Sequence, residues 1–329
     1  MNEKIKFYYS YSDFYTPVYK HNLLNRHNSL EALHGFMVQL FSGKELAILQ
    51  TKAEKNFLDS QNLNIRSIDY FDPLYPKLLK EIHQPPIVLY YLGNPDLLNL
   101  TYFGIVGTRK PSKISIIATS LLAKKISKTP NHGIISGLAS GIDREAMLSA
   151  IDLKIPCIGV LGTGLEKEYP RGNIDLYRKM KNNSKCLLLS EMRVGETIGK
   201  WSFPKRNRII TGISEALFLM EAPLKSGAMS SVYHALEQGR EIVVFDDEAL
   251  FFNEGGKKII QDGAKKISMK EISDTNHFFH ISELISEANT MNETPSLFAK
   301  LNQLEQEGYL ENLGGGYYKK KLFSASGDD

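Results

Sequence analysis

Residues 201–212 of this chain read WSFPKRNRIITG and place two aromatic rings and a proline beside Lys205, Arg206 and Arg208. Guanidinium and ammonium groups bind anions such as phosphate, and aromatic faces stack on flat rings. From Leu165 to Glu215, eleven Lys or Arg residues outnumber six Asp or Glu residues. The stretch therefore predicts a site for an anionic ligand with rings, although charge scattered over solvated helices would give the same count.

Glycine loops occur at several places along the chain and carry the same chemistry. A glycine loop before a helix presents backbone N–H groups and a helix N-terminus to an anion, which favours phosphate. Most of these loops also contain Lys or Arg. They are GTRKPS at 107–112, SGLASGID at 136–143, LGTGLEKEYPRGN at 161–173, SEMRVGETIGKWSFPK at 190–205 and EAPLKSGAMSS at 221–231.

Short apolar runs alternate with amphipathic runs from Phe103 onward, and this alternation predicts the elements that carry the loops. The apolar runs do not alternate with polar residues, which is typical of strands covered on both faces. We therefore predict an α/β fold with a doubly wound, mostly parallel sheet. Because ligands bind at the carboxyl ends of such strands, all five loops are expected along one edge. The expected strands are 103–107, 133–136, 156–161, 186–190, 216–221 and 241–245.

The remaining segments suggest additional units around this sheet. We expect a helical N-terminal region at 1–68, the sheet domain at 69–255, a glycine- and lysine-rich linker at 256–275 and a disordered tail at 323–329. Residues 276–322 predict a helix followed by two short strands around a glycine turn, the ending of a winged helix. The apolar helix 229–238 and strand 241–245 are expected to form the edge of the sheet and hence an interface.

Several classes of function find no support in the sequence. The chain shows no GxGxxG at the first turn, no P-loop and no HExxH or GxSxG motif, so we expect no cofactor, no metal and no catalysis. Cys157 and Cys186 lie in expected strands and are interpreted as core residues. No stretch is apolar enough for a membrane span and the N-terminus does not resemble a secretory signal, so we expect a cytoplasmic protein. Asp143 is expected to complement a helix dipole.

A chain of phosphates with exposed bases would fit cations, N–H groups and rings placed along one edge. Single-stranded nucleic acid has this chemistry, and its bases stack on aromatic side chains without reading sequence. An alternative for the stretch at 201–212 is that Arg206 or Arg208 pairs with a carboxylate such as Glu191 and that Trp201 packs in the core.

The loops also carry a family resemblance. The chain resembles the DNA-processing protein A family (DprA/Smf), in order and at family spacing, from about Asp72 to Phe245. The segments that carry the resemblance are the lead-in YPKLLKEIHQPPIVLYYLGN and then VGTRKPS, IISGLASGIDREAM, VLGTGLEKEYPRGN, LLLSEMRVGE, FPKRNRIITGISEALFLMEA and KSGAMSSVYHALEQGREIVVF. The resemblance implies an extended Rossmann-like domain that binds single-stranded DNA without catalytic turnover, forms a homodimer and loads the recombinase RecA during transformation.

Site residues follow from the matched motifs and from the loops that contain them. The family's phosphate loop aligns with Gly107, Thr108 and Arg109, with Thr in place of Ser, and the loop SGAMSS lacks the family's usual threonine-alanine ending. The candidate DNA-binding residues are Gly107, Thr108, Arg109, Lys110, Ser136, Gly137, Ser140, Gly141, Lys167, Arg171, Phe203, Lys205, Arg206, Asn207, Arg208, Ser226 and Gly227.

Two other functions remain as alternatives. One is a nucleotide phosphoribohydrolase with a related Rossmann-like fold, but that class carries PGGxGTxxE and no PGG occurs in this sequence. The other is a sensor of a small nucleotide that regulates a partner protein.

Overall fold

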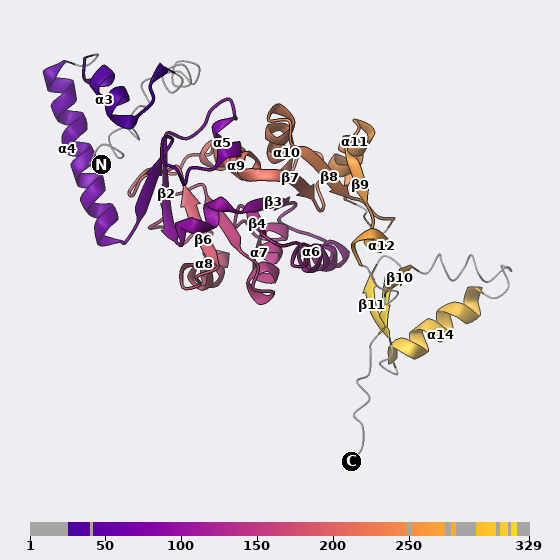
Figure 1. Cartoon of the computed structure of the whole chain (residues 1–329). Helices are drawn as coiled ribbons and strands as arrows, with labels where there is room; N and C mark the ends of the chain where they lie inside the picture. Colours follow the sequence, from indigo (N-terminus) through magenta and orange to yellow (C-terminus); the bar gives the residue numbers. More distant parts are fainter. Residues whose placement is uncertain are drawn as a thin grey trace.

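A nine-stranded sheet forms the centre of the molecule (Figure 1). The computed structural model describes residues 26–39, 42–248, 250, 252–273, 278–280, 294–306, 310–314 and 317–320. The strand order is β1-β2-β6-β5-β4-β3-β7-β8-β9. The strands are β1 (Arg66–Asp69), β2 (Val88–Gly93), β3 (Thr101–Val106), β4 (His132–Ser136), β5 (Cys157–Leu161), β6 (Cys186–Ser190), β7 (Ser214–Leu219), β8 (Glu241–Phe245) and β9 (Lys265–Ile267).

The seven strands from β3 to β9 pair in parallel, while β1 and β2 are antiparallel to their neighbours. Every residue of β5 and of β6 is buried, as expected for strands that are covered on both faces. The predicted α/β fold with a doubly wound, mostly parallel sheet is therefore confirmed.

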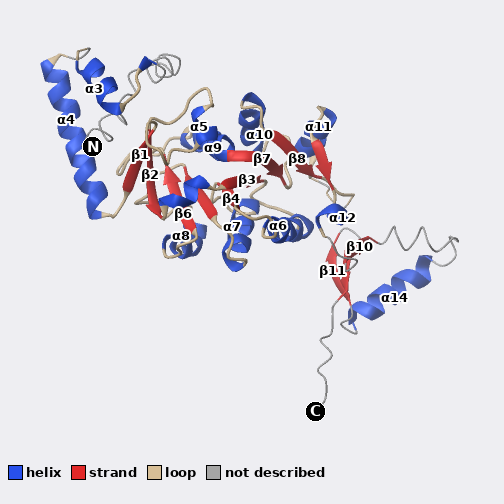
Figure 2. Cartoon of the chain, in the orientation of Figure 1, coloured by secondary structure: helices blue, strands red, loops and turns tan. Residues whose placement is uncertain are grey.

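Helices cover both faces of the sheet (Figure 2). One layer contains α6 (Lys113–Ile126), α7 (Ile142–Asp152) and α8 (Ile174–Lys181). The other layer contains α5 (Lys77–Lys80), α9 (Ser202–Ile213), α10 (Ala228–Glu237) and α11 (Glu254–Gln261). Two apolar clusters, one on each face, form the core. Short 3₁₀ helices, η2 (Pro95–Asn99) and η3 (Arg171–Asn173), complete the connections.

Two helices precede the sheet. They are α3 (Leu30–Val38) and α4 (Gly43–Asn62), and a capping box between Ser42 and Glu45 begins α4. The predicted N-terminal region is thus helical in the part of it that the structure describes. The sheet begins with β1 at Arg66, slightly before the predicted boundary at residue 69.

The predicted linker at 256–275 is wrong over most of its length. This segment contains the main part of α11, then β9 and α12 (Met269–Ile272), and β9 pairs in parallel with β8. For the same reason strand 241–245 is not the edge of the sheet, because β9 covers it. Two of the three β9 residues are lysines, so the strand lacks the apolar pattern on which strand prediction depends. Lysines on an edge strand also disfavour pairing with another sheet.

A small C-terminal unit contains α14 (Thr294–Gln306) and a three-stranded antiparallel sheet of order β10-β12-β11. Its strands are β10 (Phe278–His280), β11 (Leu310–Gly314) and β12 (Tyr317–Lys320). The expected helix and the two strands after it are present, and their assembly as a winged helix stays a prediction. The predicted tail at 323–329 lies outside the described residues.

None of the helices in the described part of the chain combines the length and the apolar character that crossing a membrane requires. Cys157 and Cys186 are buried opposite each other on β5 and β6, with their Sγ atoms 3.3 Å apart.

Candidate nucleic-acid interface

The sheet reverses its strand order between β3 and β7. From β3 the chain adds strands on one side through β4, β5 and β6, and then on the other side through β7, β8 and β9. Ligands of doubly wound sheets bind at such a switch point, beyond the carboxyl ends of the strands. The loops after β3 and β7 meet here, where the Thr108 N–H donates to the carbonyl of Glu221 over 2.7 Å.

Two hollows lie along this edge. The larger one, at the switch point, has a volume of about 850 Å³ and is lined by the loops after β3 and β7 and by α9. The smaller one, of about 60 Å³, lies between the loops after β4 and β5. Arg109, Ala139, Phe203 and Arg206 line both hollows. The five predicted loops are thus brought together, and Arg109 and Phe203 stand between two adjoining spaces.

Arg109 and Lys110 are the cations best placed to meet a ligand. Both are exposed, and neither side chain forms a hydrogen bond or an ion pair with the described residues. Gly107, Thr108, Asn207, Ser226 and Gly227 line the same large hollow. A phosphate entering there would meet two cations that form no ion pair with the described residues, although the nearby Asp143 also attracts Arg109.

Arg206 is a buried residue that supports the two hollows. Its side chain is 8% exposed, and Nη1 donates to the carbonyl of Gly137 at 2.5 Å and to that of Val160. Burial lowers the pKa of Arg206 to about 10, although the nearby Asp143 opposes that shift. Burial also raises the pKa of Asp143, against the attraction of Arg206. Arg206 therefore holds the loop after β4 in place, and only part of it lines the hollows.

Arg208 confirms the alternative of a carboxylate partner, and Lys205 shares that partner. Arg208 is buried and its Nη2 lies 2.7 Å from Glu191 Oε1, while Lys205 Nζ lies 3.4 Å from Glu191 Oε2. Neither residue lines a hollow. Trp201, by contrast, is 54% exposed and does not pack in the core, and Lys205 Nζ lies 5.5 Å from the centre of its ring.

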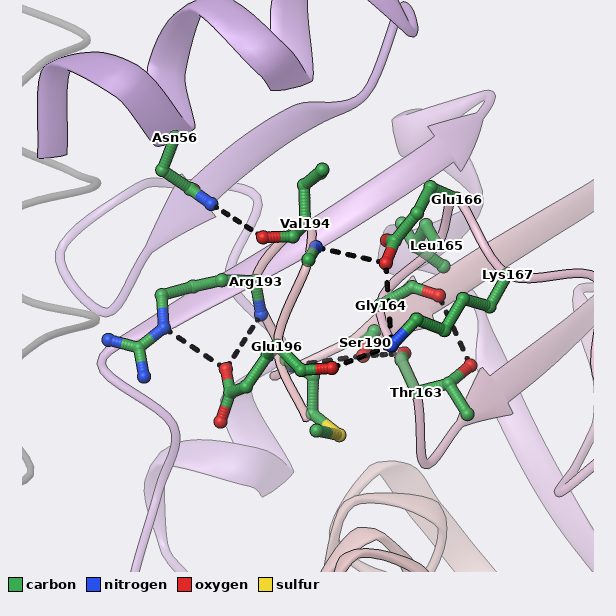
Figure 3. Close-up of polar contacts among 12 residues, drawn as sticks. Asn56, Thr163, Gly164, Leu165, Glu166, Lys167, Ser190, Arg193, Val194 and Glu196 are labelled. Atoms are coloured by element: carbon green, nitrogen blue, oxygen red, sulfur yellow. Dashed lines mark hydrogen bonds and ion pairs between the residues drawn. The ribbon is translucent and has the colours of Figure 1, made fainter. Parts of the chain in front are cut away.

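Lys167 is bound within the protein. Its Nζ donates to the carbonyl of Glu196 over 2.7 Å and lies 3.9 Å from Glu166 (Figure 3). In the same network the Gly195 N–H donates to Glu166, and Asn56 of α4 donates to the carbonyl of Val194. The network ties the loop after β5 to the loop after β6, so Lys167 acts as a brace there and does not line either hollow.

The loop after β4 contains both structural and ligand-facing candidates. The Ser136 hydroxyl is buried and donates to the carbonyl of Ile105 at 2.6 Å, so it is committed to the sheet. Gly137 and Ser140 line the small hollow. Arg171 is exposed on η3 but lines neither hollow.

Gly141 has a backbone conformation that favours glycine. Its φ is 79°, and a Cβ there would overlap Thr108 and the backbone of Arg109. We expect Gly141→Ala to lower the free energy of unfolding by about 2 kcal/mol and to displace the loop of Arg109. Urea denaturation measures the first effect. Gly172→Ala is the matched control, because Gly172 has ordinary φ and open space around its Cβ position; equal stability of both variants would contradict the expectation.

Four aromatic or cationic residues that line the hollows are absent from the predicted set. Tyr169 stacks on Phe203 with ring centres 5.4 Å apart, and Lys200, Lys225 and Phe252 line the large hollow. Tyr169, Lys200 and Lys225 lie in predicted loops, so their place in the sequence could have identified them as site candidates. Phe252 comes from the segment after β8, for which no motif exists.

Comparisons with known proteins agree with this geometry. The model of the family "DNA recombination-mediator protein A" matches residues 66–279. A Bacillus subtilis DNA processing protein DprA is 40% identical over 205 residues, which are 62% of this chain and 68% of that protein. A Streptococcus pneumoniae DprA is 36% identical over 204 residues, 61% of this chain and 71% of that protein.

Solved structures are similar as well. The structure of S. pneumoniae DprA aligns with a TM-score of 0.62 and 28% identity over 83% of this chain and 92% of that chain. A Helicobacter pylori DprA, whose structure is described for its mode of binding single-stranded DNA, aligns with a TM-score of 0.57 and 27% identity over 68% of this chain and 96% of that chain. With its Rossmann-like sheet and a family match over residues 66–279, the chain belongs to the DNA recombination-mediator protein A family, DprA/Smf.

Proposed function

We propose that this protein binds single-stranded DNA without sequence preference along the edge formed by the two hollows, and that it loads RecA onto the bound strand during transformation or homologous recombination. The observation that carries the proposal is the pair of unpaired cations, Arg109 and Lys110, at the switch point beside the Tyr169–Phe203 stack. Cations without protein partners bind phosphates, and exposed rings accept stacked bases.

The shape of the edge favours a strand over a duplex. The small hollow holds about 60 Å³ and is bounded by Tyr169 and Phe203, so it offers flat aromatic surface. Bases in a duplex are stacked on each other and paired, whereas bases of a single strand can lie against protein rings. The H. pylori relative, described as binding single-stranded DNA, supports the same ligand class.

Other parts of the proposal rest on family membership. We propose that the protein acts without catalytic turnover or a cofactor, as a cytoplasmic homodimer, with RecA as its partner. The lysines of β9 disfavour a dimer formed by pairing of that sheet edge. RecA loading is tested by whether the protein accelerates RecA filament formation on an oligonucleotide.

Titration of a fluorescent oligo-dT by anisotropy at several salt concentrations tests the binding itself. A protein that neutralises Z phosphates of a single strand should show a log-log salt slope of roughly −0.7Z. We expect the strand to bind more tightly than a duplex of equal length. Trp201 is the only tryptophan of the chain, and its exposed position should make its fluorescence change on binding.

The same titration separates the alternatives. Displacement of the oligonucleotide by a mononucleotide at equal concentration would favour a small-nucleotide sensor. Release of free base from nucleoside monophosphates would favour the phosphoribohydrolase. Equal affinity for strand and duplex would contradict the proposed function.

A further inference from the structure

The large hollow contains a buried carboxylate that the binding of phosphates does not need. Glu221 follows β7, is 3% exposed and lines the hollow that Arg109 and Lys110 border. A carboxylate repels phosphate, so a site for the DNA backbone alone would gain nothing from it. Its presence among cations suggests that this hollow also receives a neutral, hydrogen-bond-donating part of the ligand.

The two oxygens of Glu221 have different surroundings. Oε2 accepts hydrogen bonds from the Ser112 N–H and from the Ser112 hydroxyl, both at 2.9 Å, and so helps to begin α6. Oε1 accepts no hydrogen bond and forms no ion pair among the described residues. It is not among the fully buried polar atoms that lack a partner, so it keeps some exposure. Oε1 is therefore the oxygen of Glu221 that no donor among the described residues occupies.

Asp143 is the second acidic residue that lines the large hollow, and its carboxylate is less free to accept a hydrogen bond from a ligand. Its carboxylate accepts from the Ala139 N–H at 3.4 Å and lies near the buried guanidinium of Arg206. Glu221 forms no such contact with a cation in the described structure. Of the two acids, Glu221 is the one available to read a ligand.

Nucleobases differ in what they offer to a carboxylate. A carboxylate oxygen placed at position 4 of a pyrimidine accepts from the exocyclic amine of cytosine and is repelled by the carbonyl oxygen of uracil or thymine. The N3–H donor of uracil and thymine lies at the neighbouring position, so the preference depends on where the carboxylate meets the base. On the basis of the proposed function, we propose that Glu221 Oε1 selects one base of the bound strand, favouring a base with an exocyclic amine. This inference restricts the sequence tolerance of the proposed function to the other positions of the bound strand, because one position would then prefer a base type.

Oligo-dC and oligo-deoxyuridine of equal length test this preference, because both are pyrimidine strands that lack the thymine methyl group. We expect the wild-type protein to bind oligo-dC about tenfold more tightly, measured by anisotropy above neutral pH so that cytosine stays unprotonated. In Glu221→Gln the Ser112 N–H still requires an acceptor, so the amide oxygen should stay on Ser112 and the amide NH₂ should take the place of Oε1. That group donates to the uracil carbonyl, so the preference should reverse.

Ser112→Ala is the matched control. It removes the hydroxyl bond to the same carboxylate but leaves Glu221 in the hollow, since Ser112 does not line it. The control should keep the preference for oligo-dC, and thermal unfolding should show both variants folded. Equal affinities for the two strands in the wild type, or an unchanged ratio in Glu221→Gln, would leave Glu221 as a helix cap only and overturn the inference. Failure of the wild type to bind either strand would instead overturn the proposed function, and this inference with it.

Discussion

Arg109→Ala is expected to weaken binding of oligo-dT about tenfold to a hundredfold while leaving the fold intact. The guanidinium is exposed at the junction of both hollows and forms no ion pair with the described residues. The buried Asp143, which Arg109 attracts, keeps the stronger attraction of Arg206 in this variant. A hydrogen bond to a charged group contributes about 1.5 to 3 kcal/mol, which corresponds to that loss of affinity. Loss of one phosphate contact should also reduce the salt slope by roughly 0.7.

The control for this variant is Arg66→Ala. Arg66 is also exposed, but it begins β1, the first strand in the sheet order, and it lines neither hollow. It should bind oligo-dT like the wild type. Anisotropy titrations at several salt concentrations measure both variants, and thermal unfolding checks that both are folded. Equal affinities of the two variants would contradict the placement of the DNA along this edge.

Arg206→Met is expected to lower the free energy of unfolding by about 3 to 5 kcal/mol. The guanidinium is buried and bonded to the carbonyls of Gly137 and Val160, and it opposes the burial cost of Asp143. Methionine fills a similar volume but leaves those carbonyls without a donor and Asp143 without its attracting charge. Urea denaturation measures the loss, and binding should fall with the folded fraction.

The double variant Asp143→Asn with Arg206→Met sharpens this test. Removing both charges should recover part of the lost stability, because an uncompensated buried charge is the main cost. The coupling follows from the double-mutant cycle of the two single variants. If Arg206→Met instead keeps wild-type stability and loses only DNA affinity, Arg206 contacts the DNA directly and its supporting role is wrong.

The local signals of the sequence were sufficient for the sheet and its loops. The continuous apolar runs at 156–161 and 186–190 became the fully buried strands β5 and β6, because strands covered on both faces are apolar along their whole length. The sequence pattern failed to predict a strand where the residues of that strand are exposed. The strand β9 contains two exposed lysines, so residues 256–275 resembled a linker until pairing with β8 placed them in the sheet.

The amino-acid sequence by itself determined the α/β fold, the edge at which the loops gather and the family. Only the tertiary structure decided which cations face the ligand, because that depends on carboxylates and carbonyls that are distant in sequence. Arg208 and Lys205 are bound by Glu191 and Lys167 by Glu196, whereas Arg109, from the same kind of loop, has no such partner in the described structure. Residue type shows that a charge is present, but the surrounding fold decides whether the protein or the DNA neutralises it.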